Sequence, residues 1–126
     1  MKYLMKGYSN MAGRGRSARV KGATFERDLA KYFTENTELT AKRGIGQTRS
    51  GGAEVSDVDI PIVHVEAKRQ KRCRIKAAMA QAIEDANVNG KLPVAITKDD
   101  RQDILCTMRL DDWILLFNAY VSQVKK

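Results

Sequence analysis

The chain has 126 residues, and 23 Lys and Arg against 15 Asp and Glu give it a formal net charge of +8 at pH 7. Its length suits one domain, and a hydrophobic fraction of 43% is enough for a compact core. No apolar run approaches the roughly 20 residues of a membrane-spanning helix. Cys73 and Cys106 form no metal-binding motif, and no secretory signal is recognisable, so a reduced, cytoplasmic protein is expected.

Basic residues gather in two segments. Residues 1–24 contain six basic residues and no acidic one, and a second basic cluster runs from Lys68 to Lys76. A charge surplus on so small a surface attracts polyanions, of which nucleic acid is the usual one. We expect both segments to contact phosphates, with residues 1–20 as a basic flexible arm and residues 21–126 as a single domain. The alternative is that both are solvated basic loops.

The N-terminal half predicts one helix and one glycine-rich segment. Apolar residues at helical spacing indicate a helix from about residue 21 to residue 35. Residues 44–52 (GIGQTRSGG) are rich in glycine and polar residues, which indicates a loop or a strand with irregular ends. Four aromatic residues are expected in the core rather than at a binding surface: Tyr32, Phe33, Trp113 and Phe117.

The segment EVSDVDIPIVHVEAKRQ predicts two neighbouring strands that meet at a tight turn around Pro61. Residues 54–60 form the shorter strand and residues 62–68 the longer one. Because side chains alternate along a strand, the longer strand turns Val63, Val65 and Ala67 to one face and His64, Glu66 and Lys68 to the other.

The C-terminal half continues with a helix over residues 75–86, closed by residues 87–90. A short strand over residues 94–97 follows, and then a strand in which apolar residues alternate from residue 104 to residue 110. Asp111 or Asp112 is expected to cap a last helix that runs through Tyr120. The order of elements predicts an α/β fold.

The strand pair offers groups that suit phosphodiester hydrolysis. Hard divalent cations prefer oxygen ligands, typically one or two carboxylates. A neighbouring lysine can orient water and stabilise developing negative charge. Glu66 and Lys68 share a strand face, and a carboxylate of the preceding strand completes the set. Strand geometry does not choose between Asp57 and Asp59, which are two residues apart, and the alternative for Glu66 and Lys68 is a plain ion pair on an exposed strand.

The arrangement Asp-x(n)-Glu-x-Lys resembles the PD-(D/E)xK nuclease superfamily. The resemblance extends over roughly residues 21–117 and includes the segments KGATFERDLAKYF, AKRGIGQTRSGG, SDVDIPIVHVEAKRQKR, QAIEDA and LDDWILLF. It implies a restriction-endonuclease-like core, in which helices flank a mixed central β-sheet. It further implies cleavage of DNA that depends on Mg²⁺, with Mn²⁺ able to substitute. The segments from SDVDIPIVHVEAKRQKR to LDDWILLF look like those of small phage-encoded nucleases that are taken to be Holliday-junction resolvases.

The resemblance implies a role for each matching residue. Asp57 and Glu66 would bind the metal together with the main-chain carbonyl of Ala67, and Lys68 would serve the attacking water. The family's proline before the aspartate is Ser56 here. Glu26 would reach the site from the first helix, Arg49 and Ser50 would lie near the scissile phosphate, and Gln81 would be auxiliary. The expected DNA-binding residues are Arg49, Ser50, Arg69, Lys71, Arg72 and Gln81.

A resolvase must cut two strands of a four-way junction symmetrically, so the resemblance also implies a twofold homodimer. Exposed apolar positions of the last helix or of the helix over residues 75–86 would form its interface. Three alternatives stay open: a general, nicking or restriction-like endonuclease, a non-catalytic basic DNA-binding protein on the same fold, and a ribonuclease. His64 shares the face of Glu66, but a lone histidine is more often structural, and it is not assigned a catalytic role.

Overall fold

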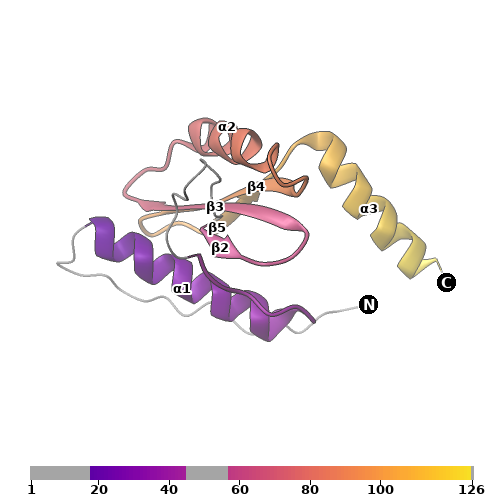
Figure 1. The fold of residues 1–126 in the computed structure, drawn as a ribbon, viewed down its shortest axis with the longest axis horizontal. Helices are drawn as coiled ribbons and strands as arrows, with labels where there is room; N and C mark the ends of the chain where they lie inside the picture. Colours follow the sequence, from indigo (N-terminus) through magenta and orange to yellow (C-terminus); the bar gives the residue numbers. More distant parts are fainter. Residues whose placement is uncertain (1–17, 45–56, 126) are drawn as a thin grey trace.

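A computed structural model of the chain describes residues 18–44 and 57–125 (Figure 1). The helices and strands, in chain order, are α1 (Ala18–Asn36), β1 (Lys42–Arg43), β2 (Val58–Asp59), β3 (Val63–Gln70), α2 (Ile75–Ala86), β4 (Leu92–Asp99), β5 (Ile104–Thr107) and α3 (Leu110–Val124). The fold is therefore α/β, as the sequence predicts. Within these two ranges, no helix is long and apolar enough to cross a membrane.

The five strands form one mixed sheet in the order β1-β2-β3-β4-β5, with β3 at its centre. β3 and β4 are parallel, and every other neighbouring pair is antiparallel. Two parallel strands need a crossover connection, which α2 provides here. The sheet and its helices have the arrangement of a restriction-endonuclease-like core.

The helices α1 and α2 cover opposite faces of the sheet (Figure 1). On the α1 side, Val58, Val65 and Ala67 pack with Phe25 and Leu29 in the larger buried cluster. On the α2 side, the smaller cluster joins residues of α2 to the middle of β4. The side-chain alternation predicted for residues 62–68 is confirmed, and it leaves His64 and Glu66 on the α2 side.

Several predicted boundaries are wrong by a few residues. β2 is shorter than the predicted strand over residues 54–60, of which residues 54–56 lie outside the described ranges. β4 is longer than predicted, because Pro93 lies inside it and pairs with His64. The last helix is not capped by Asp111 or Asp112: it begins at Leu110 with Arg109 as its N-cap residue, and β5 consequently ends earlier than predicted.

The helix α3 extends away from the sheet (Figure 1). The prediction that Trp113 and Phe117 lie in the core is wrong, because their exposed fractions are 45% and 44%. The two rings stack on each other, with centroids 4.9 Å apart. Tyr32 and Phe33 are half-buried, and Phe33 packs against the larger core cluster as predicted. The sequence shows that Trp113 and Phe117 are aromatic. Whether another part of the protein covers them depends on the path of α3.

Candidate functional site

The candidate site has two carboxylates, Asp57 and Glu66, at the place where β2 pairs with β3. Asp57 directly precedes β2, and its backbone N–H donates a 3.0 Å hydrogen bond to the carbonyl of Val65. The N–H of Ala67 in turn donates a 2.8 Å bond to Oδ2 of Asp57. The two bonds are made by Val65 and Ala67, the chain neighbours of Glu66. The antiparallel pairing itself therefore brings the Asp57 carboxylate beside the segment that carries Glu66 and Lys68.

Asp57 and Asp59 have different surroundings. The charges that act on the Asp57 carboxyl are those of Glu66, Glu26 and Lys68. Asp59 instead pairs with Lys42 across β1 and lines a separate surface hollow that includes Lys42 and Lys91. Strand geometry alone did not choose between these two aspartates. In the structure Asp57 is the one whose carboxyl is affected by the charges of Glu66 and Glu26.

Burial and neighbouring negative charge make Asp57 a weak acid. Loss of solvation raises its pKa from 3.8 to about 7, and the charge of Glu66 acts in the same direction. Burial is also the main reason that the pKa of Glu66 is raised. The two carboxylates therefore repel each other in a poorly solvated place, and positive charge between them would relieve that repulsion.

Lys68 supplies positive charge at the edge of this pair. Its Nζ lies 3.4 Å from Oε2 of Glu66, and its side chain is 42% exposed against 10% for Glu66. The carboxylate is thus held inside while the ammonium group reaches solvent. The ion pair of the alternative interpretation is present, but the strand is not exposed, because β3 is the central strand and Glu66 is buried.

Glu26 of α1 acts on the same two carboxylates through its charge. Its charge raises the pKa of both Asp57 and Glu66. Its own Oε1 accepts a 2.9 Å bond from Nε of Arg43 on β1. The structure thus brings Glu26 near these carboxylates, and it adds a partner, Arg43, that sequence reasoning did not single out.

A second group of possible ligands lies on the other side of Glu66. Single ligand atoms of His64, Glu66 and Asp85 all lie within 4.8 Å of one another. Nε2 of the buried His64 is 3.9 Å from Oδ2 of Asp85 on α2. Glu66 is therefore shared by two sets of groups, one with Asp57 and one with His64 and Asp85.

Asp85 is the functional candidate that the sequence analysis missed. Its two carboxylate oxygens accept 3.0 Å bonds from Nε2 of Gln81, one turn earlier on α2. The side-chain amide of Asn89 contacts Nδ1 of His64 at 3.4 Å. The i, i+4 spacing of Gln81 and Asp85 is visible in the sequence. That this helix face meets His64 of β3 follows only from the packing.

The expected DNA-contacting residues are not equivalent. Arg69 donates a 2.7 Å bond to Oδ1 of Asp100, so its charge is paired within the fold. Lys71 and Arg72 are exposed just after β3. Arg49 and Ser50 lie outside the described residues.

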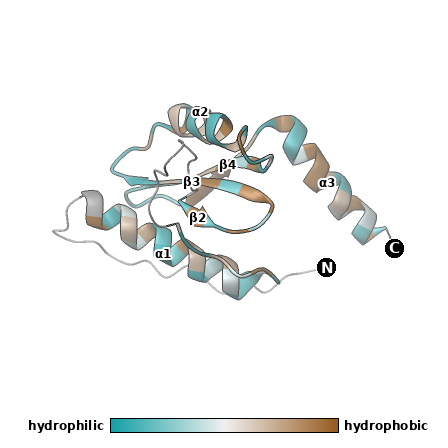
Figure 2. Cartoon of the chain, viewed as in Figure 1, coloured by the Kyte–Doolittle hydropathy of each residue, from teal (hydrophilic) through white to brown (hydrophobic). Residues whose placement is uncertain are grey.

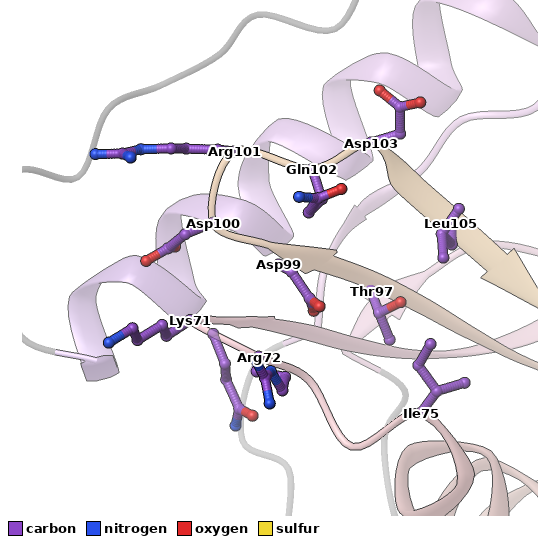
Figure 3. Close-up of a pocket in the computed structure, with 11 residues that line it drawn as sticks. Lys71, Arg72, Ile75, Thr97, Asp99, Asp100, Arg101, Gln102, Asp103 and Leu105 are labelled. Atoms are coloured by element: carbon purple, nitrogen blue, oxygen red, sulfur yellow. The ribbon is translucent and has the colours of Figure 1, made fainter.

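A groove of about 1010 Å³ lies beyond the carboxyl ends of β3 and β4. Thr97 and Leu105 pair with each other across β4 and β5, and Ile75 of α2 lies on the same side (Figure 3). Lys68 is the partner of Thr97 in the parallel register, but none of Asp57, Glu66 and Lys68 is among the described residues that line the groove. Three basic and three acidic residues line it: Lys71, Arg72, Arg101, Asp99, Asp100 and Asp103. Figure 3 shows the Arg101 side chain extending outward from the turn between β4 and β5.

The donor set fits a hard divalent cation. Carboxylate and main-chain carbonyl oxygens are the ligands that Mg²⁺ and Mn²⁺ take, usually with water completing the shell. Asp57 and Glu66 supply two carboxylates, and the carbonyl of Ala67 lies between Glu66 and Lys68 in the chain. The raised pKa of each carboxyl agrees with this fit. The ionised forms are disfavoured without a cation, and a bound cation would favour them.

The sequence matches one family model, described as "Phage putative PDDEXK endonuclease", over residues 17–125. The match includes every described residue, and with them the strand pair that carries Asp57, Glu66 and Lys68. No curated protein and no solved structure matches the chain significantly.

Proposed function

The chain belongs to the phage PDDEXK endonuclease family, within the PD-(D/E)xK nuclease superfamily, and from this premise we propose that it is a Mg²⁺-dependent endonuclease that resolves four-way DNA junctions. In this proposal Asp57 and Glu66 hold the cation together with the carbonyl of Ala67, and Mn²⁺ substitutes for Mg²⁺. The substrate is branched DNA in the cytoplasm of a phage-infected cell.

One observation carries the proposal. Main-chain bonds hold the Asp57 carboxylate against the segment of β3 that carries Glu66, while Lys68 extends toward solvent from the strand face that it shares with Glu66. A structural ion pair needs one carboxylate for one ammonium group. Here a second, half-buried carboxylate has its pKa raised to about 7, which weakens the fold unless a cation is bound. Such a destabilising arrangement is typical of a functional site.

The residues divide the work of hydrolysis. The cation would supply positive charge that offsets the charge of the pentavalent phosphate and lowers the pKa of water. Asp57 and Glu66 hold their carboxylates ready through the β2–β3 pairing. Lys68 orients the attacking water and stabilises negative charge as it develops on the phosphate oxygens. Glu26, which is held by Arg43, adds negative charge that strengthens attraction for the cation.

The basic surface suits a branched polyanion. Lys71 and Arg72 line the groove, and Arg101 extends from its rim (Figure 3). The excess positive charge of the chain attracts DNA without regard to sequence. Symmetric cutting of a junction requires two active sites, so the acting form is proposed to be a homodimer.

The test is cleavage of a labelled synthetic four-way junction by the purified full chain in Mg²⁺. We expect paired nicks at symmetric positions, and little cutting of a linear duplex with the same sequence. Glu66→Gln should bind the junction without cutting it, and Glu84→Gln on the outer side of α2 is the matched control that should cut normally.

Each alternative has its own outcome in this assay. Equal cutting of the linear duplex would replace the junction resolvase by a general or nicking endonuclease. Binding without cutting in Mg²⁺ or Mn²⁺ would favour the non-catalytic DNA-binding protein. Faster cutting of an RNA strand than of its DNA counterpart would indicate a ribonuclease.

A further inference from the structure

The most apolar exposed surface of the described chain is on α3. Eight of the twelve large hydrophobic residues that are exposed belong to this one helix. Figure 2 shows hydrophobic residues along most of its length, away from the sheet. A monomer rarely leaves so many neighbouring apolar side chains in water, because each would gain free energy by burial.

These residues form one face rather than a ring. At about 100° per residue, the largest group falls within roughly half of the helix circumference. We call this group the α3 face: Leu110, Trp113, Ile114, Leu116, Phe117, Tyr120, Val121 and Val124. The rest of the circumference carries the polar residues Asp111, Asn118, Ser122 and Lys125, together with one further exposed apolar residue, Leu115. Such a pattern is that of a helix that packs against something.

Within the described ranges, the body of the fold does not cover the α3 face. The only buried residue of α3 is Asp112, and it is held by a 3.0 Å ion pair with Arg109 at the start of the helix. Ile104 and Met108, which precede α3, pack against the larger core cluster, whereas no residue of α3 belongs to that cluster or packs against it. The α3 face therefore needs a partner from outside these ranges.

We propose that the partner is a second copy of this chain, and that the two α3 helices pack antiparallel across a twofold axis at Phe117. An isologous interface must match itself, with each residue i meeting a residue j and j meeting i. On α3 the ends and the middle of the face meet this condition about Phe117. Leu110 meets Val124 of the second copy, and Phe117 meets its own counterpart.

The charges of α3 favour this direction of packing. Asp111 lies near the beginning of the helix and Lys125 follows its end, on the same side of the apolar face. Antiparallel packing brings Asp111 of each copy toward Lys125 of the other. Parallel packing would instead place like charges together at both ends. The antiparallel arrangement also sets opposite ends of the two helix dipoles next to each other.

The aromatic residues of α3 lie where an interface uses them. A helix of this length is about 22 Å long. The residues that contribute most to a protein–protein interface lie near its centre and are often aromatic. The stacked rings of Trp113 and Phe117 lie at the middle of the face, and the aliphatic residues Leu110 and Val124 lie at its ends. The inference supplies the interface for the dimer in the proposed function, and in that respect it rests on that function.

Disulfide trapping tests the arrangement residue by residue. The background is Cys106→Ser, because Cys106 is the exposed cysteine and Cys73 is buried. In this background Phe117→Cys should form a covalent dimer under mild oxidation. Ser122→Cys, on the polar side, is the matched control and should stay monomeric on a non-reducing gel. Leu110→Cys and Val124→Cys should each crosslink poorly alone and efficiently when mixed.

The crosslinking pattern decides between orientations. Efficient self-crosslinking of Leu110→Cys and Val124→Cys would overturn the antiparallel arrangement in favour of a parallel one. If Phe117→Cys does not crosslink and sedimentation shows a monomer at all concentrations, the second copy is wrong and the face takes another protein or DNA.

A second measurement keeps this inference separate from the nuclease proposal. Phe117→Asp should raise the dissociation constant of the dimer by about 30-fold or more, with the circular dichroism spectrum unchanged. On the junction it should convert paired nicks into single, uncoupled ones. Lys68→Ala should stop cutting and leave the dimer intact. A dimer without any cutting would contradict the nuclease alone, and unpaired cutting by a monomeric wild type would contradict the interface alone.

Discussion

The N–H of Ala67 donates a 2.8 Å hydrogen bond to Oδ2 of Asp57, and this bond joins the segment before β2 to the middle of β3. It places a carboxylate of one strand against the main chain between Glu66 and Lys68 of the next. The bond also lowers the pKa of Asp57, but burial and the charge of Glu66 outweigh it. The hydrogen bond fixes the position of the Asp57 carboxylate but does not offset its negative charge. The first predictions below follow from that uncompensated charge.

Asp57→Asn should abolish cleavage and at the same time stabilise the protein. The amide keeps an oxygen that accepts the Ala67 hydrogen bond, but it removes a charge from a poorly solvated place. We expect stability at pH 8, without divalent cations, to rise by on the order of 2 kcal/mol. Asp59→Asn is the matched control: cleavage and stability should stay near wild type. Thermal unfolding and junction cleavage measure the two effects, and loss of cleavage in Asp59→Asn alone would exchange the two assignments.

Stability without divalent cations should fall as the pH rises. The folded-state pKa of Asp57 is about 7, above its ordinary value of 3.8. The stabilising contribution of a raised pKa is fully present below the unfolded-state pKa and is lost as the pH rises through the folded-state pKa. The window is therefore about pH 4 to pH 7, and the raised pKa of Glu66 acts in the same direction. Urea unfolding of wild type and of Asp57→Asn across this window should show a smaller decrease in the variant; equal slopes would contradict the shift.

Divalent cations should reverse that pH dependence. Ca²⁺, which binds carboxylates without supporting cleavage in many Mg²⁺ sites, should raise the unfolding temperature more at pH 8 than at pH 5.5, because protons compete for the same oxygens. Cleavage in Mg²⁺ should likewise rise with pH through about 7. Calorimetric titration with Mn²⁺ gives the affinity directly. Unchanged Mn²⁺ affinity in Glu66→Gln would remove Glu66 from the ligand set.

Asp85→Asn distinguishes the two sets of groups that share Glu66. If the cation binds between Asp57 and Glu66, the substitution should weaken Mn²⁺ binding by less than about 10-fold, because Asp85 then acts only through its charge. If the cation binds among His64, Glu66 and Asp85, Mn²⁺ affinity should fall much further, and His64→Gln should have a similar effect. Titration of both variants beside Asp57→Asn identifies the set that is used.

Lys68→Ala should reduce the cleavage rate by about 100-fold or more while the affinity for junction DNA changes little. The ammonium group contacts Glu66 at 3.4 Å and lies at the solvent side of the carboxylates. Lys31→Ala, on the exposed side of α1, is the control and should cleave normally. Single-turnover cleavage with a parallel binding assay separates the two effects. A loss of binding as large as the loss of cleavage would show that Lys68 holds DNA and has no part in the chemistry.

Lys71→Ala and Arg72→Ala should each weaken DNA binding and lower the salt dependence of the affinity by about one unit of slope on a double-logarithmic plot. Both side chains are exposed on the groove. Arg69→Ala should instead lower thermal stability, because it leaves Asp100 without its 2.7 Å partner. Binding isotherms from low to high salt provide the measurement, and unchanged slopes in the first two variants would exclude the groove as a DNA path.

The sequence predicted the elements that carry the site better than it predicted their limits. Alternation along residues 62–68 correctly separated His64 and Glu66 from Val65, because the period of a strand is independent of what packs on it. Helical spacing likewise predicted α2 with its observed bounds. The start of α3 was misjudged, because two aspartates make a good cap in the sequence while the chain already turns into the helix at Leu110.

By itself the sequence determined the periodic properties of this protein: which residues share a face of β3, which residues of α2 and α3 are apolar, and which segments are basic. Only the tertiary structure decided how those faces meet. Pairing of β2 with β3 brought Asp57 against the main chain of Ala67, and packing of α2 placed Asp85 beside His64. The path of α3 left Trp113 and Phe117 exposed. The reason is physical: periodicity arises from local backbone geometry, whereas the partner of each face depends on contacts between residues far apart in the chain.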